Sequence, residues 1–272
     1  MYEKYWELKE KPFKNTPDPR FLYHSPMHEE ALLKLTYAVA EGMGAALLSG
    51  VFGCGKTLLG QAILNDLGAE KYRMAFINHP PSTSAEIIRA IVRNLKATNL
   101  PEKMNELMTD SLLEILQEIL IANMQAGLET VVLIDEAHAI TDDRIFDSLR
   151  MLLNFQLQNK FLLTLLLVGQ PEIRQKVSNL KQLEQRIAIR CHLDHFKEDE
   201  TASYIVHRLK VAGCEKEIFT PDALQKIHEF STGIPRKINH FCDLSLLTGM
   251  GKKTKSIDAS LIIQSGKEFG SA

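Results

Sequence analysis

Short apolar runs recur through the first two thirds of this 272-residue chain, and helical patterns separate them. The runs are too short for core helices and predict buried strands at residues 45–48, 74–78, 131–134, 161–168 and 187–193. Amphipathic patterns predict helices at 27–41, 85–95 and 107–124. Strands that are apolar on both faces and alternate with helices are typical of a parallel sheet covered on both sides. We therefore predict an α/β fold with a five-stranded parallel sheet flanked by helices.

The strand pattern ends at about residue 197, and only helical patterns follow. These cover residues 198–212, 221–231, 235–248 and 258–269, with Gly, Ser, Thr and Pro between them. At the other end, the first 25 residues are rich in aromatic residues and proline, which opposes a long helix. The predicted organisation is a lead-in over 1–25 packed on the main body, an α/β domain over 26–195 and a helical lid over 196–272.

A glycine-rich loop follows the first predicted strand. The stretch "GVFGCGKT" places Gly50, four residues, and then Gly55-Lys56-Thr57 between a strand and a helix, which is the pattern of a phosphate-binding loop. In such a loop, the backbone N–H groups wrap a polyphosphate, Lys56 reaches the β- and γ-phosphates, and the Thr57 hydroxyl binds Mg²⁺. The expected nucleotide contacts are Gly50, Val51, Phe52, Gly53, Cys54, Gly55, Lys56, Thr57 and Leu58. The alternative is a glycine loop that merely closes the turn.

The stretch "VVLIDEAH" at residues 131–138 supplies two carboxylates at the end of another buried strand. Ligands of open α/β sheets gather at that edge. We expect Asp135 to hold the metal and Glu136 to orient and polarise the attacking water. The alternative is an acidic pair that solvates a strand end. The letters "DEAH" also suggest a helicase, but such an enzyme needs a second α/β motor domain, so we interpret His138 as an ordinary polar residue.

Three further positions are candidates for contact with the γ-phosphate. Gln170 follows the fourth predicted strand, although it would equally cap a turn before a proline. Arg236, in "STGIPRKINHF", opens a helix of the lid and could report the γ-phosphate. Arg186, with Arg190 as second choice, could reach the site of a neighbouring subunit, because a positive charge there stabilises the transition state. A surface ion pair is the alternative for both.

Composition changes this picture little. The chain carries 32 basic and 34 acidic residues, so the formal charge of −2 gives no sign of a protein that coats nucleic acid. No apolar run reaches the roughly 20 residues of a membrane span, and the charged N-terminus lacks the apolar core of a secretory signal. We expect a cytoplasmic protein, linked to a membrane only through partners.

Cysteine chemistry offers one further candidate. The four cysteines form no metal-type pair, which fits a reducing compartment: Cys54, Cys191, Cys214 and Cys242. Cys54 stands just before a helix N-terminus and beside Lys56, and both features lower the pKa of an exposed thiol. Cys54 is therefore either a small filler or a reactive thiol that nucleotide protects.

The motifs together resemble those of AAA+ ATPases: "GVFGCGKT", "LIDEAH", "LVGQPEIR", "LEQRIAIR" and "GIPRKIN" occur in that order. The opening "YWELKEKPFKNTPDPRFLYHSPMHEEAL" is further similar to the ExeA, or general secretion pathway protein A, branch, which includes ATPases of pilus biogenesis. The resemblance implies a RecA-like core with a helical lid, a sensor glutamine at Gln170 and a lid sensor arginine at Arg236. Longer members continue into a membrane-spanning segment and a peptidoglycan-binding region, so we expect a short form or an ATPase fragment.

Three functions remain open from the sequence. The favoured one is an ATPase that uses ATP and Mg²⁺, self-associates into a ring or higher oligomer, and drives assembly of a secretion or pilus machine. The second is an ATP-dependent DNA-binding regulator of the transposition type, for which "KKTK" at 252–255 is too short a basic stretch. The third is a switch that binds nucleotide and hardly hydrolyses it. The partner protein and the oligomer size do not follow from the residues.

Overall fold

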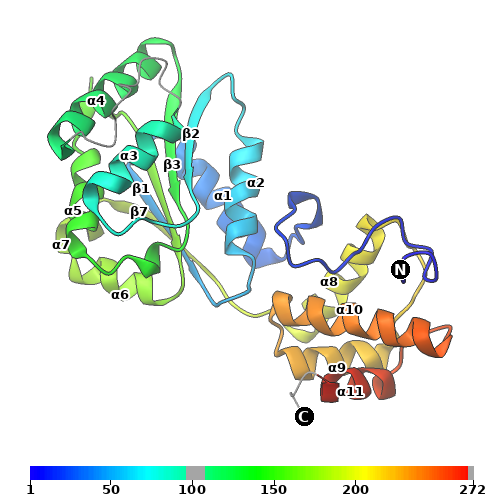
Figure 1. Ribbon diagram of the computed structural model, residues 1–272. Helices are drawn as coiled ribbons and strands as arrows, with labels where there is room; N and C mark the ends of the chain where they lie inside the picture. Colours follow the sequence, from blue (N-terminus) through cyan, green and yellow to red (C-terminus); the bar gives the residue numbers. More distant parts are fainter. Residues whose placement is uncertain (96–107, 269–272) are drawn as a thin grey trace. The chain divides into compact units, whose positions relative to one another are not determined.

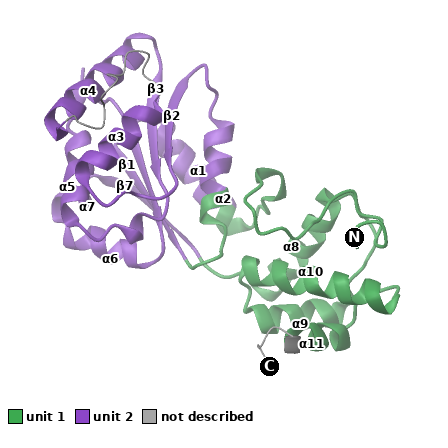
Figure 2. Cartoon of the chain, in the orientation of Figure 1, with its two compact units in different colours: residues 1–28, 51–58, 194–272 green, residues 29–50, 59–193 purple. Residues whose placement is uncertain are grey.

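The computed structural model describes residues 1–95 and 108–268 (Figure 1). The first residue of the helix predicted over 107–124 and the last of that over 258–269 lie outside this range. The chain forms two compact units, coloured separately in Figure 2. The sheet unit comprises residues 29–50 and 59–193, and the helical unit comprises 1–28, 51–58 and 194–272. The glycine-rich loop thus groups with the helical unit, although the strand before it belongs to the sheet unit.

The sheet unit contains the predicted five-stranded parallel sheet. Its strands are β1 (Ala45–Gly50), β2 (Tyr72–Ile77), β3 (Glu129–Ile134), β6 (Thr164–Gly169) and β7 (Ile187–Leu193), in the order β2-β3-β6-β1-β7. All neighbouring pairs are parallel. The inner strands β1 and β6 are buried at every position, whereas the edge strands β2 and β7 also have exposed or half-buried positions. This arrangement confirms the predicted fold class and explains why the inner strands read as continuous apolar runs.

Helices cover the sheet. They are α1 (Pro26–Ala40), α2 (Lys56–Asp66), α3 (Ser84–Asn94), α4 (Thr109–Gln125), α5 (Asp143–Leu152), α6 (Glu172–Asn179) and α7 (Lys181–Glu184). Figure 1 shows α3, α4 and α5 on the side of the sheet opposite to α1 and α2. The core between α3 and the sheet contains Ile87, Ile88 and Ile91, and the Thr83 hydroxyl caps α3 by accepting from the Glu86 N–H. The sequence patterns predicted α3 and α4 but not the shorter α5, α6 and α7.

The predicted strand over 161–168 is divided in the structure. Phe161 belongs to a small hairpin of β4 (Gln156–Leu157) and β5 (Lys160–Phe161), and β6 begins only at Thr164. Gln158 and Asn159 connect the hairpin with φ angles of 51° and 63°. Positive φ at both central residues is the geometry of a two-residue hairpin turn that matches strand twist. The apolar run therefore contains the end of a hairpin, a link and a strand.

The helical unit contains α8 (Glu198–Val211), α9 (Pro221–Ser231), α10 (Pro235–Lys252) and α11 (Ala259–Glu268), preceded by the short helix η1 (Pro19–Phe21). The lead-in packs against these helices. Trp6 is buried and donates from Nε1 to the Leu246 carbonyl at 2.9 Å. Buried Arg208 of α8 donates to the Lys14 carbonyl at 3.1 Å. The aromatic residues of the lead-in thus complete the core of the helical unit.

A helix that crosses a bilayer needs about 20 consecutive, predominantly apolar residues. Within residues 1–95 and 108–268, no helix is long and apolar enough to span a membrane.

Candidate nucleotide site

The glycine-rich loop adopts the predicted strand, loop and helix order. β1 ends at Gly50 and α2 begins at Lys56. We call residues 51–58 the phosphate loop. Gly53 and Gly55 have φ angles of 82° and 95°, which L side chains rarely adopt. A Cβ at Gly53 would also lie 2.9 Å from the Arg236 Cβ, so both conformation and space require glycine there.

Lys56 is held inside the phosphate loop. Its side chain is only 5% exposed, and Nζ donates to the Val51 carbonyl at 2.9 Å. Because α2 begins at Lys56, the first N–H groups of the helix have no partner within the helix and can bind an anion. The loop therefore places a cation and backbone N–H donors within a few residues of one another, and these are the groups that bind a polyphosphate.

The helical unit brings Arg236 to the phosphate loop. The Arg236 N–H donates to the Gly53 carbonyl at 3.3 Å. Its guanidinium lies 5.0 Å from the centre of the Phe52 ring, which is 54% exposed. Arg236 is itself exposed and follows Pro235, the first residue of α10. The structure thus unites Phe52, Gly53 and Arg236, three residues predicted to contact nucleotide.

His28 supports the same loop, and sequence reasoning missed it. It is 3% exposed; Nδ1 lies 2.8 Å from the Ser25 hydroxyl and Nε2 lies 3.0 Å from the Cys54 carbonyl. Because the carbonyl can only accept, Nε2 carries the proton and Nδ1 accepts from Ser25. Burial lowers the pKa of His28, so the neutral ring is favoured. The residues are 26 positions apart, and no local pattern links them.

Cys54 is not the reactive thiol that its position suggested. Its side chain is fully buried. Burial raises the pKa of the thiol, and the opposing effect of the Lys56 charge is smaller. The expectation of a lowered pKa was wrong because it required an exposed side chain. The backbone N–H of Cys54, which donates to the Val51 carbonyl at 3.3 Å, is the remaining donor that this residue can offer to phosphate.

The sheet unit carries the predicted carboxylates at the carboxyl ends of its strands. Asp135 follows β3, is 1% exposed, and accepts the Glu136 N–H on Oδ1 at 2.8 Å. Glu136 has a left-handed backbone with φ 53° and ψ 30°. A left-handed non-glycine residue costs about 1–3 kcal/mol and is often found at functional sites. β6 pairs directly with β3, so Gln170, which follows β6, extends from the same edge of the sheet.

Side-chain contacts join these strand ends. Nε2 of His138 lies 3.3 Å from a Glu136 carboxylate oxygen and 2.8 Å from the side-chain amide nitrogen of Gln170. The Gln170 N–H donates to His138 Nδ1 at 3.3 Å. We call Asp135, Glu136, His138 and Gln170 the strand-end cluster. The structure therefore brings Glu136 and Gln170 together as predicted candidates, and it adds His138 as the link between them.

Two candidates lie elsewhere in the sheet unit. Arg186 directly precedes β7. It therefore lies where the parallel strands begin, whereas the strand-end cluster lies where they end. Its guanidinium donates to the Leu153 carbonyl at 3.5 Å and to Asn154 Oδ1 at 3.2 Å. Arg190, within β7, donates to the Glu184 carbonyl at 3.0 Å. The structure does not bring either arginine to the carboxylates of its own chain.

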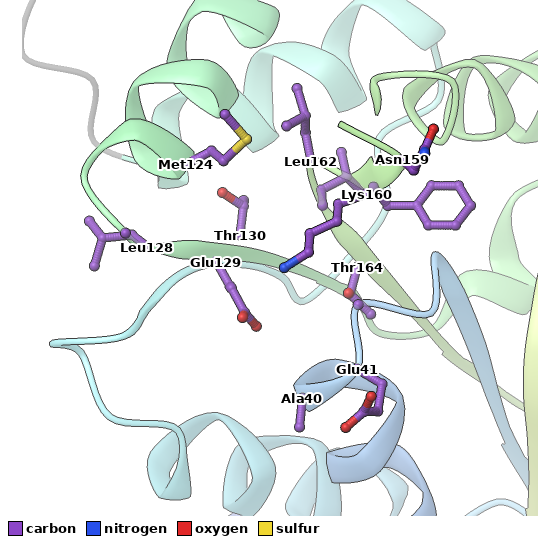
Figure 3. Close-up of a pocket in the computed structure, with 14 residues that line it drawn as sticks. Ala40, Glu41, Met124, Leu128, Glu129, Thr130, Asn159, Lys160, Leu162 and Thr164 are labelled. Carbon is purple, nitrogen blue, oxygen red and sulfur yellow. The ribbon is translucent and has the colours of Figure 1, made fainter. Parts of the chain in front are cut away.

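A cavity of about 520 Å³ lies at this opposite edge, beside the first residues of β3 and β6 (Figure 3). Glu129, Thr130 and Thr164 line it from the strands, and Lys160 and Phe161 from the hairpin. Among the described residues, no member of the strand-end cluster and no residue of the phosphate loop lines it. The cavity is therefore distinct from the predicted nucleotide site.

The residues proposed to hold Mg²⁺ have the right donor chemistry. Mg²⁺ prefers oxygen ligands, keeps several waters, and is commonly bound through one or two carboxylates together with substrate phosphates. Asp135 provides a buried carboxylate at a strand end, and Thr57 provides a hydroxyl in the first turn of α2. Each of the two side chains is thus an oxygen donor of the kind that Mg²⁺ prefers.

Comparison with known proteins agrees with this geometry. Residues 40–177 match the family described as AAA domain. The chain is 37% identical over 259 residues to general secretion pathway protein A of Aeromonas hydrophila; the match covers 94% of this chain and 46% of that protein, so the chain spans about half of its relative's length.

Similar solved structures are much more distant in sequence. The Aeropyrum pernix ORC2 protein in its ADPNP-ADP complexes has a TM-score of 0.73 at 18% identity, covering 96% of this chain and 72% of that chain. Cdc6p from Pyrobaculum aerophilum has a TM-score of 0.72 at 20% identity, and the match covers 93% of this chain and 71% of that chain. At such identities, these likenesses show the fold alone.

Proposed function

Because this chain belongs to the AAA domain family and is homologous to general secretion pathway protein A, we propose that it binds Mg²⁺-ATP and hydrolyses it. The observation that carries the proposal is the strand-end cluster, in which a buried carboxylate, a second carboxylate and a polar amide converge at one sheet edge. A domain that only bound nucleotide would need no second carboxylate placed to polarise water. Hydrolysis is therefore favoured over a passive switch.

The residues divide the reaction between them. The N–H groups of the phosphate loop and Lys56 hold the β- and γ-phosphates, and Lys56 exchanges the Val51 carbonyl for phosphate oxygen. Thr57 and Asp135 would hold Mg²⁺, which would neutralise charge on the phosphates. Glu136 orients the attacking water and accepts its proton. Gln170 and Arg236 contact the γ-phosphate; Arg236 is exposed and can turn from the Phe52 ring.

Arg186 completes the site of a neighbouring copy. It lies at the sheet edge opposite to its own strand-end cluster, so a role in transition-state stabilisation requires a second subunit. We favour Arg186 over Arg190, because Arg190 lies within β7 and is also 3.8 Å from the Glu184 carboxylate. Self-association into a ring or higher oligomer follows from this assignment.

The cellular role is assembly of a secretion or pilus machine. The relative's name supports the secretion part of this proposal, and the match covers 94% of this chain and 46% of that protein. The net charge of −2 does not favour the alternative, an ATP-dependent DNA-binding regulator. A gel shift with long duplex DNA at low salt, with and without ATP, separates the two. ATP-dependent retention of DNA would favour the alternative.

Two substitutions test the proposed chemistry. Lys56→Ala removes a phosphate contact and should weaken ATP binding about 100-fold or more. Glu136→Gln should keep the affinity within about threefold and lower turnover about 100-fold or more, because it removes only water activation. Fluorescent-nucleotide titration and phosphate release measure the two quantities. Hydrolysis by Glu136→Gln at the parent rate would refute the assigned carboxylate, and absence of hydrolysis by the parent oligomer with Mg²⁺-ATP would refute the ATPase itself.

A further inference from the structure

The ring of His138 has one hydrogen-bond role fixed by the backbone. The Gln170 N–H points to Nδ1 at 3.3 Å, so Nδ1 must accept. A neutral imidazole has one acceptor nitrogen and one N–H donor. Nε2 therefore carries the proton, and His138 has a single donor to offer on that side.

Two groups compete for this donor. A Glu136 carboxylate oxygen lies 3.3 Å from Nε2, and the end of the Gln170 side chain lies 2.8 Å from the same atom. The oxygen and nitrogen of an amide are assigned from their surroundings. Because Nε2 carries a proton, the contact to Gln170 is a hydrogen bond only when the amide oxygen faces the ring. The single Nε2–H donor therefore has two acceptors nearby, and the shorter contact is to Gln170.

The backbone around the ring is closely fixed. Lys176 Nζ donates to the carbonyls of His138 and Ile140, each at 2.6 Å. A Cβ at Gly169 would lie 3.0 Å from the His138 N and 3.4 Å from its Cβ, so the strand and the turn approach as closely as glycine permits. The backbone that carries the imidazole is therefore held in place, so a change in the partners of Nε2 requires rotation of side chains.

From this competition we infer that His138 is a positioning residue: the hydrogen bond that it makes or loses with Gln170 determines whether it can hold the Glu136 carboxylate in place. When Gln170 turns toward the γ-phosphate, it gives up the His138 Nε2–H, which then holds one oxygen of Glu136 and leaves the other to accept the proton of water. When Gln170 occupies the donor, Glu136 loses that anchor. The inference rests on the proposed ATPase function, because it assigns the γ-phosphate contact to Gln170.

A pair of substitutions separates the donor from the shape of the ring. His138→Gln can place an N–H near the position of Nε2, whereas His138→Asn reaches only the position of Nδ1 and lacks that donor. We expect His138→Asn to lower kcat about 10- to 100-fold with KM and ATP affinity within about twofold, since misplacing a catalytic group costs about this much. His138→Gln should recover most of kcat. Equal kcat in all three proteins, equal losses in both variants, or a parallel loss of ATP affinity would each overturn the inference.

A spectroscopic test does not depend on hydrolysis. In the full chain labelled with ¹⁵N-histidine, the His138 signal, assigned by its loss in His138→Gln, should show Nδ1 unprotonated and Nε2 protonated. Adding Mg²⁺ with a non-hydrolysable ATP analogue should shift the Nε2–H resonance in the parent and leave it within line width in Gln170→Ala. A protonated Nδ1, or an equal shift in Gln170→Ala, would overturn the inference even in an active ATPase. The expected spectra in an inactive protein would refute hydrolysis and leave the hydrogen-bond competition standing.

Discussion

The phosphate loop and the strand-end cluster are held in place by different kinds of contact. Backbone carbonyls of the loop accept hydrogen bonds from Lys56, Arg236 and His28. In the strand-end cluster, every contact uses at least one side-chain acceptor or donor: His138 lies between the side chains of Glu136 and Gln170, and the backbone N–H groups of those two residues donate to Asp135 Oδ1 and His138 Nδ1. A backbone acceptor survives most substitutions, whereas a side-chain contact does not. We therefore expect the loop to tolerate sequence change except at its glycines, Lys56 and Thr57, and the cluster to depend on every side chain.

The comparison also separates binding from turnover. Changes in the phosphate loop should act first on nucleotide affinity, and changes in the strand-end cluster should act first on the chemical step. Four further experiments break or sharpen this division.

The largest effect is expected from a residue in neither region. Arg186→Ala should lower turnover about 100-fold or more and leave ATP affinity within about threefold, because we assign this arginine to the transition state in a neighbour's site. Mixing it with Glu136→Gln should restore part of the activity, since Arg186→Ala subunits keep intact carboxylates and can receive an arginine. Phosphate release across mixing ratios measures the recovery. No recovery at any ratio, with mixed oligomers shown by native mass spectrometry, would contradict action in trans.

Gly53→Ala sharpens the loop side of the comparison. The substitution forces φ near 82° on alanine and brings its Cβ to 2.9 Å from the Arg236 Cβ. We expect ATP affinity to fall about tenfold or more, beyond the roughly 1 kcal/mol that the backbone conformation alone costs. Gly42→Ala is the matched control, because Gly42 also has a positive φ, 57°, but a Cβ at that position would meet nothing within 4 Å. Equal ATP affinities of the two variants in nucleotide titration would show that contact with Arg236 is unimportant.

His28→Asn tests the buried support of the loop through pH. Burial lowers the pKa of His28 below 6.5, so below that pH the unfolded chain binds a proton that the native protein does not. The charge of Glu200 opposes this shift and that of His24 adds to it. The free energy of unfolding of the parent should exceed that of the variant by about 1–3 kcal/mol at pH 7.5. This difference should narrow as the pH falls to 5.5.

Thermal unfolding of the parent and of His28→Asn at both pH values measures that difference. His207, whose pKa burial also lowers, is present in both proteins and cancels. A gap in unfolding free energy that stays constant with pH would mean that the native fold does not lower the pKa of His28, and a gap that widens as the pH falls would mean that the native protein binds the proton more tightly.

The smallest effect concerns Cys54. Because its thiol is fully buried and burial raises its pKa, we expect slow alkylation in the native protein, no faster than that of Cys191. Mg²⁺-ATP should change the rate less than twofold. Peptide mapping after a timed maleimide pulse gives the rates, with the protein in denaturant as the control. Rapid labelling that ATP suppresses would show that the loop opens enough to expose the thiol.

The sequence was informative where a local pattern determines the structure. Apolar runs located β1, β3 and β6 because buried parallel strands are apolar on both faces. The glycine spacing located the phosphate loop because the required φ angles restrict the residue type at Gly53 and Gly55.

It was uninformative where contacts join residues far apart in the chain. His138 and Gln170 are 32 residues apart, and neither is unusual in its own segment. The aromatic residues of the lead-in pack with residues of α8 and α10, and no pattern within residues 1–25 specifies that surface. Cys54 shows a third limit: its position beside Lys56 indicated a reactive thiol, whereas the direction of the side chain decides its exposure.

The division of the chain has a consequence for heat inactivation. Residues 51–58 group with the helical unit, while β1 before them and most of α2 after them belong to the sheet unit. Melting of the helical unit would remove the contacts that Arg236 and His28 make to the loop, although the sheet could stay folded. On warming, the protein would then lose its affinity for nucleotide before it loses its β structure. The stability of the helical unit, more than that of the sheet unit, would then set the highest temperature at which the protein binds nucleotide.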